Sequence, residues 1–214
     1  MKKLYTENDI VDLIRQGARV INVAPESLFT PSALDKARDA KIKIIRNKDV
    51  EKVEAAKSEK QLFKKVALGC DHTGLELKSV LINHLKSKSF EITDVGTYSS
   101  DSCDYPDFAI KVAEQVLSGK VEFGIMIDAT GIPSSITVNK LPGIRGATCY
   151  NEFTAKSARE HNNANIMVLG AKAIGEETAK SIIDKWIVTK FAGGRHQRRL
   201  DKIIQLEESL LKKK

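Results

Sequence analysis

Side chains suited to acid/base chemistry and anion binding are gathered in four short stretches of this 214-residue sequence. Carboxylates and imidazoles exchange protons with bound molecules, and guanidinium groups bind phosphate through paired hydrogen bonds. Together, these residue types favour proton transfer on a small phosphorylated molecule. The four stretches are Asp71-His72, Asp128, His161-Asn162 and Arg195 with Arg199.

Asp128 ends a largely apolar segment, 123–127, which predicts a buried strand running into a tight loop, 129–131, and then a helix. A single acid at the carboxyl end of such a strand points into the crevice where open α/β sheets place ligands. A carboxylate with a reference pKa of about 3.9 is a weak base unless burial raises that pKa.

Asp71 and His72 follow another predicted strand, at the first junction between a strand and a helix. Aspartate accepts hydrogen bonds from sugar hydroxyls, and histidine can bond a phosphate. Asp71 could equally be only a helix cap, because caps favour aspartate. In the next long loop, Tyr105 could contact a ligand with its ring and its hydroxyl. Alternatively, this segment is only a turn before a helix. Cys103 beside it has no evident base partner and is interpreted as incidental.

The last two stretches are basic. His161 closes a predicted helix, where a histidine often does no more than interact with the helix dipole. Arg195 and Arg199 lie four residues apart on one face of a helix that follows two glycines, 193–194, and this arrangement suits a phosphate. A solvated basic helix is the alternative. His196 is expected to pack or to cap the helix.

Strand candidates alternate with helical segments from residue 62 onward, which predicts a parallel sheet with helices on both faces. The expected fold class is α/β and Rossmann-like, with the flavodoxin-like strand order 2-1-3-4-5. A last helix, from about Arg195 to Leu211, has no strand after it, so its apolar positions are expected to dock on a neighbouring subunit. The five strand candidates are 66–69, 90–95, 124–127, 146–149 and 166–169.

The N-terminal residues carry a separate pattern of two helices and two short strands, with Thr6 and Thr30 as predicted caps. We therefore expect a small α/β appendage at 1–45, a charged linker at 46–61, and one domain with a C-terminal helix at 62–214.

Composition narrows the class of protein. No apolar run reaches the roughly 18 residues of a membrane span, and no secretory signal is visible. Three cysteines form neither metal-ligand spacing nor a disulfide framework, which favours the cytoplasm. The net charge of +7 is spread thinly, with 13 Lys and Arg against 10 Asp and Glu in residues 1–60 and 22 against 18 in 61–214. Without a basic stripe, neither nucleic acid nor a membrane is expected as a partner.

The segment from Val66 to Ile203 resembles the ribose-5-phosphate isomerase B and galactose-6-phosphate isomerase family. Four motifs of that family occur in the expected order, and a fifth is changed. The four are Gly69-x-Asp-His-x-Gly-x-x-Leu-Lys78, Asp104-Tyr-Pro106, His161-Asn162 and Gly193-Gly-Arg-His-x-x-Arg199. The changed motif is Asp128-Ala-Thr-Gly131, where most members carry Cys-Gly-Thr-Gly.

The resemblance implies an aldose-ketose isomerase of carbohydrate metabolism, with ribose 5-phosphate and ribulose 5-phosphate of the pentose phosphate pathway as the expected pair. Ring opening and proton transfer through an enediolate would need no metal and no organic cofactor. The family shares its active site across a dimer. The implied catalytic residues are Asp128, Thr130 and His161. The implied substrate-binding residues are Asp71, His72, Tyr105, Ala129, Gly131, Asn139, Asn162, Arg195 and Arg199.

The changed motif leaves two interpretations open. Asp128 could replace the family cysteine as the base, or the chain could be a weak or inactive sugar-phosphate-binding subunit beside a cysteine-bearing paralogue. The A subunit of galactose-6-phosphate isomerase is similar here, with Ile-Asp-Ala-x-Gly, and works beside a cysteine-bearing B subunit. Pro133 also replaces a family glycine and has no N–H to donate to an anion.

Residues 1–45 lie outside this resemblance. Their pattern, Leu4-x-Thr-Glu-x-Asp-Ile10 followed by Thr30-Pro-x-Ala33, is similar to leader segments of proteins from bacterial microcompartment loci, such as ethanolamine-utilisation cobalamin adenosyltransferase. The resemblance implies association with such a compartment, and a small dimerisation element is the alternative.

Overall fold

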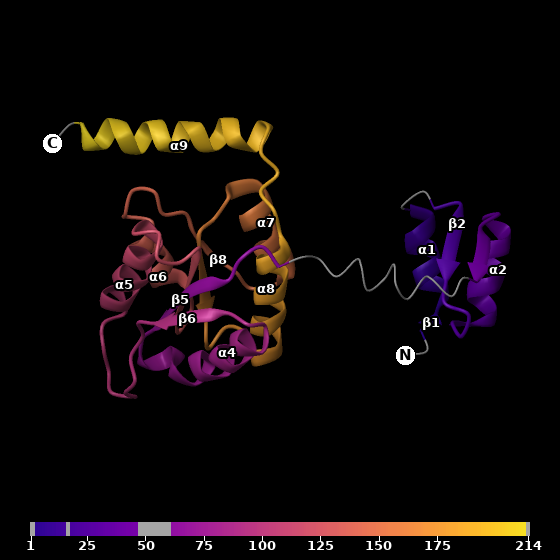
Figure 1. The fold of residues 1–214 in the computed structure, drawn as a ribbon, viewed down its shortest axis with the longest axis horizontal. Coiled ribbons are helices and arrows are strands. Elements are labelled where there is room, and N and C mark those ends of the chain that lie inside the picture. Colours follow the sequence, from indigo (N-terminus) through magenta and orange to yellow (C-terminus); the bar gives the residue numbers. More distant parts are fainter. Residues whose placement is uncertain (1–2, 16–17, 47–60, 213–214) are drawn as a thin grey trace. The chain divides into compact units, whose positions relative to one another are not determined.

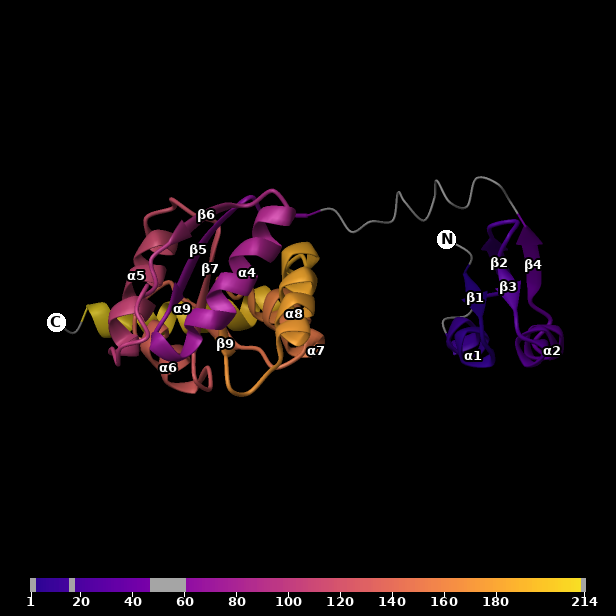
Figure 2. The same cartoon turned by 90° about the horizontal axis from the view of Figure 1, so that it is seen from below.

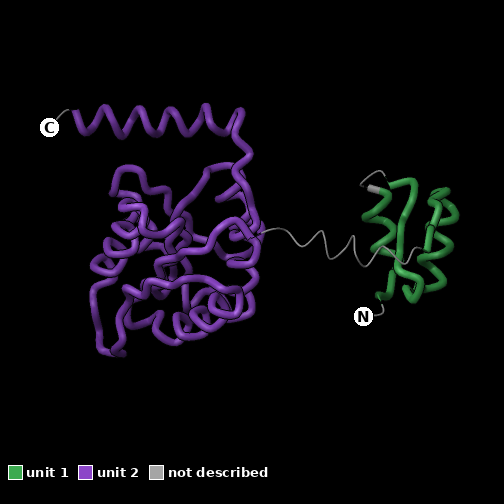
Figure 3. Tube along the Cα trace, in the orientation of Figure 1, with its two compact units in different colours: residues 1–60 green, residues 61–214 purple. Residues whose placement is uncertain are grey.

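The computed structural model describes residues 3–15, 18–46 and 61–212, and the chain divides into two compact units, residues 1–60 and 61–214 (Figure 3). The predicted linker, 46–61, lies outside the described residues apart from its two end residues. Each unit has its own apolar core.

The first unit consists of two strand-helix-strand segments, each opening with a leucine, an aromatic residue and a threonine. Its elements are β1 (Leu4–Tyr5), α1 (Glu7–Arg15), β2 (Val20–Val23), β3 (Leu28–Phe29), α2 (Pro31–Asp39) and β4 (Lys43–Arg46). Thr6 donates its N–H and its hydroxyl to Asp9 Oδ2 at 2.6 and 2.7 Å, and Thr30 caps α2. β1 pairs with β3 and β2 with β4, all in parallel. The two predicted helices and the two predicted strands, β2 and β4, are present, and the sequence did not reveal β1 and β3.

The second unit is a five-stranded parallel sheet flanked by helices. Its strands are β5 (Lys65–Cys70), β6 (Glu91–Asp94), β7 (Phe123–Asp128), β8 (Gly146–Thr148) and β9 (Ile166–Gly170). Its helices are the short η1 (His72–Gly74), α4 (Leu75–Ser87), α5 (Tyr105–Leu117), α6 (Ile132–Val138), α7 (Glu152–Asn162), α8 (Glu176–Val188) and α9 (Arg195–Leu211). No helix in the described part of the chain combines the length and apolar character that a bilayer span requires.

Helices cover both faces of this sheet, with α5 and α6 on one side and α4, α7 and α8 on the other (Figures 1 and 2). Along β7, Phe123, Ile125 and Ile127 pack beneath α4, α7 and α8, whereas Met126 packs towards α5. Every residue of β7 is buried, as a central strand of a parallel sheet requires. The predicted α/β class is confirmed.

The strand order is β6-β5-β7-β9-β8, or 2-1-3-5-4 along the chain, so the predicted order 2-1-3-4-5 is wrong for the last two strands. β9 is buried throughout and pairs with both β7 and β8. β8 has three half-buried residues and lies at the edge. A short strand without a continuous apolar run suits an edge, where one side of its backbone has no neighbouring strand.

The parallel sheet separates the predicted site residues. All carboxyl ends of the strands meet at one edge, and the six residues of β7 put the other edge about 16 Å away. The helices run back, so α7 ends near the amino ends of the strands. There Asn165 C=O accepts the N–H of Gly124, at the start of β7, at 2.9 Å. The chain before α9 also lies there, because Ala192 N–H donates to Glu160 C=O at 2.9 Å.

Candidate active site

Polar side chains, most of them predicted site residues, form two clusters at opposite edges of the sheet. The carboxyl-edge cluster consists of Asp71, His72, Cys103, Asp128 and Thr130. The amino-edge cluster consists of His161, Asn162, Arg195, His196 and Arg199. Within the residues that the structure describes, no three His, Cys, Asp or Glu side chains are grouped closely enough to hold a metal ion.

Asp71 caps the turn that follows β5. Its Oδ1 accepts the N–H (2.9 Å) and the hydroxyl (2.6 Å) of Thr73 and the N–H of Gly74 (3.2 Å). The capping role considered from the sequence is therefore present. All three hydrogen bonds fall on Oδ1, and the predicted contact of Asp71 with substrate stays a prediction.

Asp128 is more tightly enclosed, with 1% of the residue exposed. Its Oδ1 accepts the N–H groups of Thr130 (2.8 Å) and Gly131 (2.5 Å), and its Oδ2 accepts the N–H of Ser134 (3.0 Å). Both carboxylate oxygens thus hold the loop that leads into α6. The amides that could stabilise a negatively charged oxygen of a substrate instead bind a side chain of the same loop.

The backbone conformation and close packing of position 131 explain why this loop has a glycine there. The Gly131 φ of +80° favours a residue without Cβ, and an added Cβ would lie 2.7 Å from Thr148 Cγ2. Its carbonyl accepts the Thr148 hydroxyl at 2.9 Å. Ala129 is half-buried, and its carbonyl accepts the N–H of Lys172 at 2.9 Å. Thr130 is exposed, as direct contact with a ligand would require.

His72 and Cys103 contact each other across two loops. The N–H of Cys103 donates to His72 Nδ1 at 3.3 Å, and its Sγ lies 3.8 Å from the same nitrogen. The expectation that Cys103 has no base partner is therefore wrong. Because Nδ1 accepts this N–H, Nε2 carries the proton of a neutral His72 ring and can donate to an anion.

A buried ion pair shapes the loop that leads to Cys103. Lys78, with 2% of its side chain exposed, lies 2.9 Å from Asp94 Oδ2, and its ammonium also donates to Thr97 C=O at 2.7 Å. It lies 4.0 Å from the ring centre of Tyr98. Tyr105 begins α5 and packs half-buried against the apolar core.

At the amino edge, the rings of His161 and His196 stack in parallel with centroids 4.4 Å apart. Arg195 Nε donates to His196 Nε2 at 3.4 Å. Arg195 and Arg199 are exposed at the start of α9, and in the described part of the chain neither is recorded in an ion pair with a carboxylate. Two exposed guanidinium groups at a helix start can bind an anion.

Arg159 is a supporting residue that the sequence did not reveal. It is buried, and its guanidinium lies 4.9 Å from the ring centre of Phe63 and 5.6 Å from that of Trp186. It donates to Ala164 C=O and to Asn163 Oδ1, and so fixes the turn after His161. Burial lowers the pKa of Arg159 to about 10. Nothing in the sequence distinguishes it from a surface arginine.

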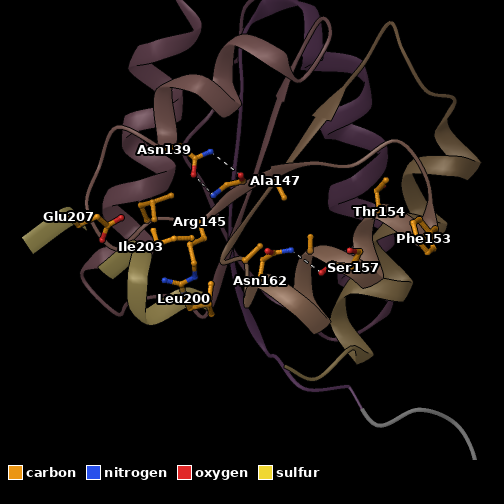
Figure 4. Close-up of a pocket in the computed structure, with 14 residues that line it drawn as sticks. Asn139, Arg145, Ala147, Phe153, Thr154, Ser157, Asn162, Leu200, Ile203 and Glu207 are labelled. Atoms are coloured by element: carbon orange, nitrogen blue, oxygen red, sulfur yellow. Dashed lines mark hydrogen bonds between the residues drawn. The ribbon is translucent and has the colours of Figure 1, made fainter. Parts of the chain in front are cut away.

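A cavity of about 450 Å³ opens beside the amino-edge cluster, between α7, β8 and α9 (Figure 4). Asn162, which donates to Ser157 C=O at 3.2 Å, lines it together with Arg145 and Leu200. Asn139 also lines it, but its amide is committed to backbone groups: Nδ2 donates to Ser135 and Gly146 C=O, and Oδ1 accepts the N–H of Gly146. Its predicted contact with substrate stays a prediction.

Comparison with known protein families matches residues 66–203 to the model described as Ribose/Galactose Isomerase. Ribose-5-phosphate isomerase B of Escherichia coli is 42% identical over 146 residues, which cover 68% of this chain and 98% of the relative. A putative sugar phosphate isomerase of Rickettsia bellii is 48% identical over 138 residues, covering 64% of this chain and 96% of the relative.

Solved structures match the same region. Ribose-5-phosphate isomerase B of Clostridium thermocellum has a TM-score of 0.67 at 45% identity, covering 68% of this chain and 99% of that structure. The Mycoplasma genitalium protein of the same name, solved with bound ribulose 5-phosphate, has a TM-score of 0.65 at 40% identity, covering 67% and 96%. The second unit therefore corresponds to nearly the full length of these relatives, and the first unit lies outside the match.

Proposed function

The chain belongs to the ribose/galactose isomerase family, and on that premise we propose that it interconverts ribose 5-phosphate and ribulose 5-phosphate. The observation that carries the proposal is the near-complete match of the second unit to ribose-5-phosphate isomerases B, with four family motifs intact. Arg195 and Arg199 bind the phosphate in this proposal, and Asp71 and Tyr105 bind the sugar. The first unit lies outside the match to these relatives and has no part in this proposal.

The proposed reaction has two proton-transfer stages. His161 takes the proton of the anomeric hydroxyl and returns one to the ring oxygen, which breaks the bond between the ring oxygen and C1. Asp128 then removes the proton from C2 and delivers it to C1, while the O2 hydroxyl proton moves to O1 and leaves a ketone at C2. Asp128 Oδ2 is the better base of its two oxygens, because it accepts one loop N–H where Oδ1 accepts two.

The two clusters act together only if a second copy of the chain contributes one of them. They lie at opposite edges of one sheet, and a proton donor must be within about 3 Å of the atom it serves. A dimer in which the amino-edge cluster of one copy meets the carboxyl-edge cluster of the other meets this need. Exposed apolar residues on α7 and α9, the helices that carry the amino-edge cluster, supply contact area for that dimer. They include Phe153, Ile203, Ile204, Leu206 and Leu210.

A second function is favoured by one observation. Both oxygens of Asp128 are bound to loop amides, so the carboxylate supports the loop whether or not it moves protons. In this alternative the chain binds sugar phosphate but turns it over weakly, and pairs with a cysteine-bearing relative. Residues 1–45, through their resemblance to microcompartment leaders, would direct either form to a bacterial microcompartment.

Assay of the purified chain with ribose 5-phosphate and with galactose 6-phosphate tests the proposal, with Asp128→Cys as the paired variant. Turnover of ribose 5-phosphate by the natural chain supports it. Turnover by Asp128→Cys alone favours the weak-subunit alternative, since the family thiol then restores a missing group. If neither form binds or converts either sugar phosphate, both proposals fail.

A further inference from the structure

We propose that His196 is a positioning residue that couples phosphate binding at Arg195 to the proton-transfer group His161. The inference rests on the proposed function and deepens it, because it assigns a role to a side chain that touches neither the sugar nor the reacting atoms. His196 was expected from the sequence only to pack or to cap a helix.

Geometry places the His196 ring between the two functional groups. One face stacks on His161, with centroids 4.4 Å apart and an interplanar angle of 5°. Its Nε2 accepts the Nε–H of Arg195 at 3.4 Å. An imidazole nitrogen that accepts a hydrogen bond carries no proton, so this arrangement selects the neutral His196 ring with its proton on Nδ1.

The surrounding charges favour the same form. Burial, followed by the positive groups of His161, Arg195 and Arg199, lowers the pKa of His196, and Glu160 opposes this. Glu160 Oε2 lies 3.6 Å from His161 Nε2 and 3.7 Å from the ammonium of Lys156. A neutral ring beneath His161 lets that histidine take up a proton without facing a second imidazolium.

His161 is held on its other side as well. Its Nδ1 lies 3.3 Å from the hydroxyl of Ser157, one turn earlier on α7. The ring plane is therefore set by Ser157 and by the stack on His196. Phosphate that binds Arg195 offsets the guanidinium charge next to His196, and the stacked ring transmits the change to His161.

Nuclear magnetic resonance of the imidazole groups tests this coupling with inorganic phosphate as the probe. The chain has four histidines, and His84, bonded to Asp184 at 2.7 Å between α4 and α8, serves as the internal reference. Phosphate is expected to shift the ring signals of His196 and His161 and to leave those of His84 unchanged. In His196→Phe, which keeps a flat ring but cannot accept from Arg195, the His161 shift should be lost while phosphate still binds by calorimetry.

The outcomes separate this inference from the proposed function. Phosphate binding with an equal His161 shift in the natural chain and in His196→Phe overturns the coupling but leaves the isomerase proposal intact. An absence of any phosphate binding overturns both.

Kinetics give a second readout. His196→Ala is expected to lower kcat roughly tenfold or more with little change in KM, because His161 loses its support. His196→Phe should recover part of that loss, whereas Arg198→Gln, an exposed control on the same helix turn, should match the natural chain. Equal kcat in His196→Ala and the natural chain would contradict the positioning role.

Discussion

The carboxyl-edge and amino-edge clusters use their polar groups in opposite ways. At the carboxyl edge, the buried Asp71 and Asp128 each accept three hydrogen bonds from their own loops. At the amino edge, Arg195 and Arg199 are exposed, and the histidines are held by ring stacking and by one arginine. The carboxylates of the carboxyl-edge cluster already have hydrogen-bond donors from the chain, whereas the amino-edge cluster exposes its guanidinium groups.

This difference indicates which cluster is already ordered without ligand and which cluster gains most from binding an anion. A preorganised loop maintains its geometry without ligand, as proton transfer requires. Exposed guanidinium groups gain most when an anion arrives, because they give up few internal bonds. In the proposed site, the carboxyl-edge cluster therefore moves the proton between C2 and C1, and the amino-edge cluster of a second copy binds the phosphate and opens the ring.

Asp128→Asn should break the carboxyl-edge cluster most severely. The amide cannot take up the C2 proton, and its NH2 group faces the N–H of Ser134, so kcat should fall by about 10²- to 10⁴-fold. KM should change little, since the amino-edge cluster binds the phosphate in the proposed site. Steady-state assay with ribose 5-phosphate measures both. Asp107→Asn, an exposed acid on α5, is the control, and unchanged kcat in Asp128→Asn would contradict a catalytic Asp128.

Lys78→Ala tests whether the carboxyl edge owes its rigidity to the buried ion pair. It leaves Asp94 without its ammonium partner, which should cost about 3 kcal/mol in the free energy of unfolding. Urea denaturation measures the loss. Lys86→Ala, at an exposed position of the same helix, should cost less than about 0.5 kcal/mol. Equal losses in the two variants would show that the pair does not stabilise this edge.

Arg195→Gln tests the outward-facing cluster. Loss of a charged hydrogen-bond donor to phosphate should lower kcat/KM by about 10- to 100-fold, mostly through KM. The loss should shrink with a substrate analogue that lacks the phosphate. A similar loss with and without the phosphate would mean that Arg195 acts on the fold and not on the anion.

The smallest effect concerns buried thiols at the sheet. Burial raises the pKa of Cys70 to about 11 and that of Cys149 to about 12. In the unfolded chain these thiols ionise near pH 9, so the folded state loses stability as pH rises from 9 towards 11. The difference between pH 8 and 9.5 should be on the order of 1.5 kcal/mol for the two thiols together. Urea unfolding of a Cys70→Ala, Cys149→Ala variant should show a smaller pH dependence; an equal dependence would assign the effect to other groups.

The sequence predicts the elements of this fold well because their patterns are local. The all-apolar β7 and β9, the caps Thr6 and Thr30, and the helix from Arg195 to Leu211 follow from residues close in sequence. The order of β8 and β9 depends on which of the two strands pairs with a strand on each side. In the sequence, only the shortness of β8 and its lack of a continuous apolar run hint at that outcome.

Contacts within the site were harder to predict because they join distant loops. Cys103 and His72 are 31 residues apart, and no spacing rule links them. The stack of His161 on His196 joins two helices that pack only in the folded domain. The loop of Asp128 was located correctly, but the use of both carboxylate oxygens by backbone amides depends on atomic geometry.

Mixing two inactive variants tests the shared site most directly. Asp128→Asn damages one cluster and His161→Gln the other, so each variant alone should be nearly inactive. If one copy completes the site of another, mixed dimers contain one intact site, and an equal mixture should regain about one quarter of the natural activity after subunit exchange. Activity that stays at the sum of the two single variants, with exchange shown by mass spectrometry, would contradict the account.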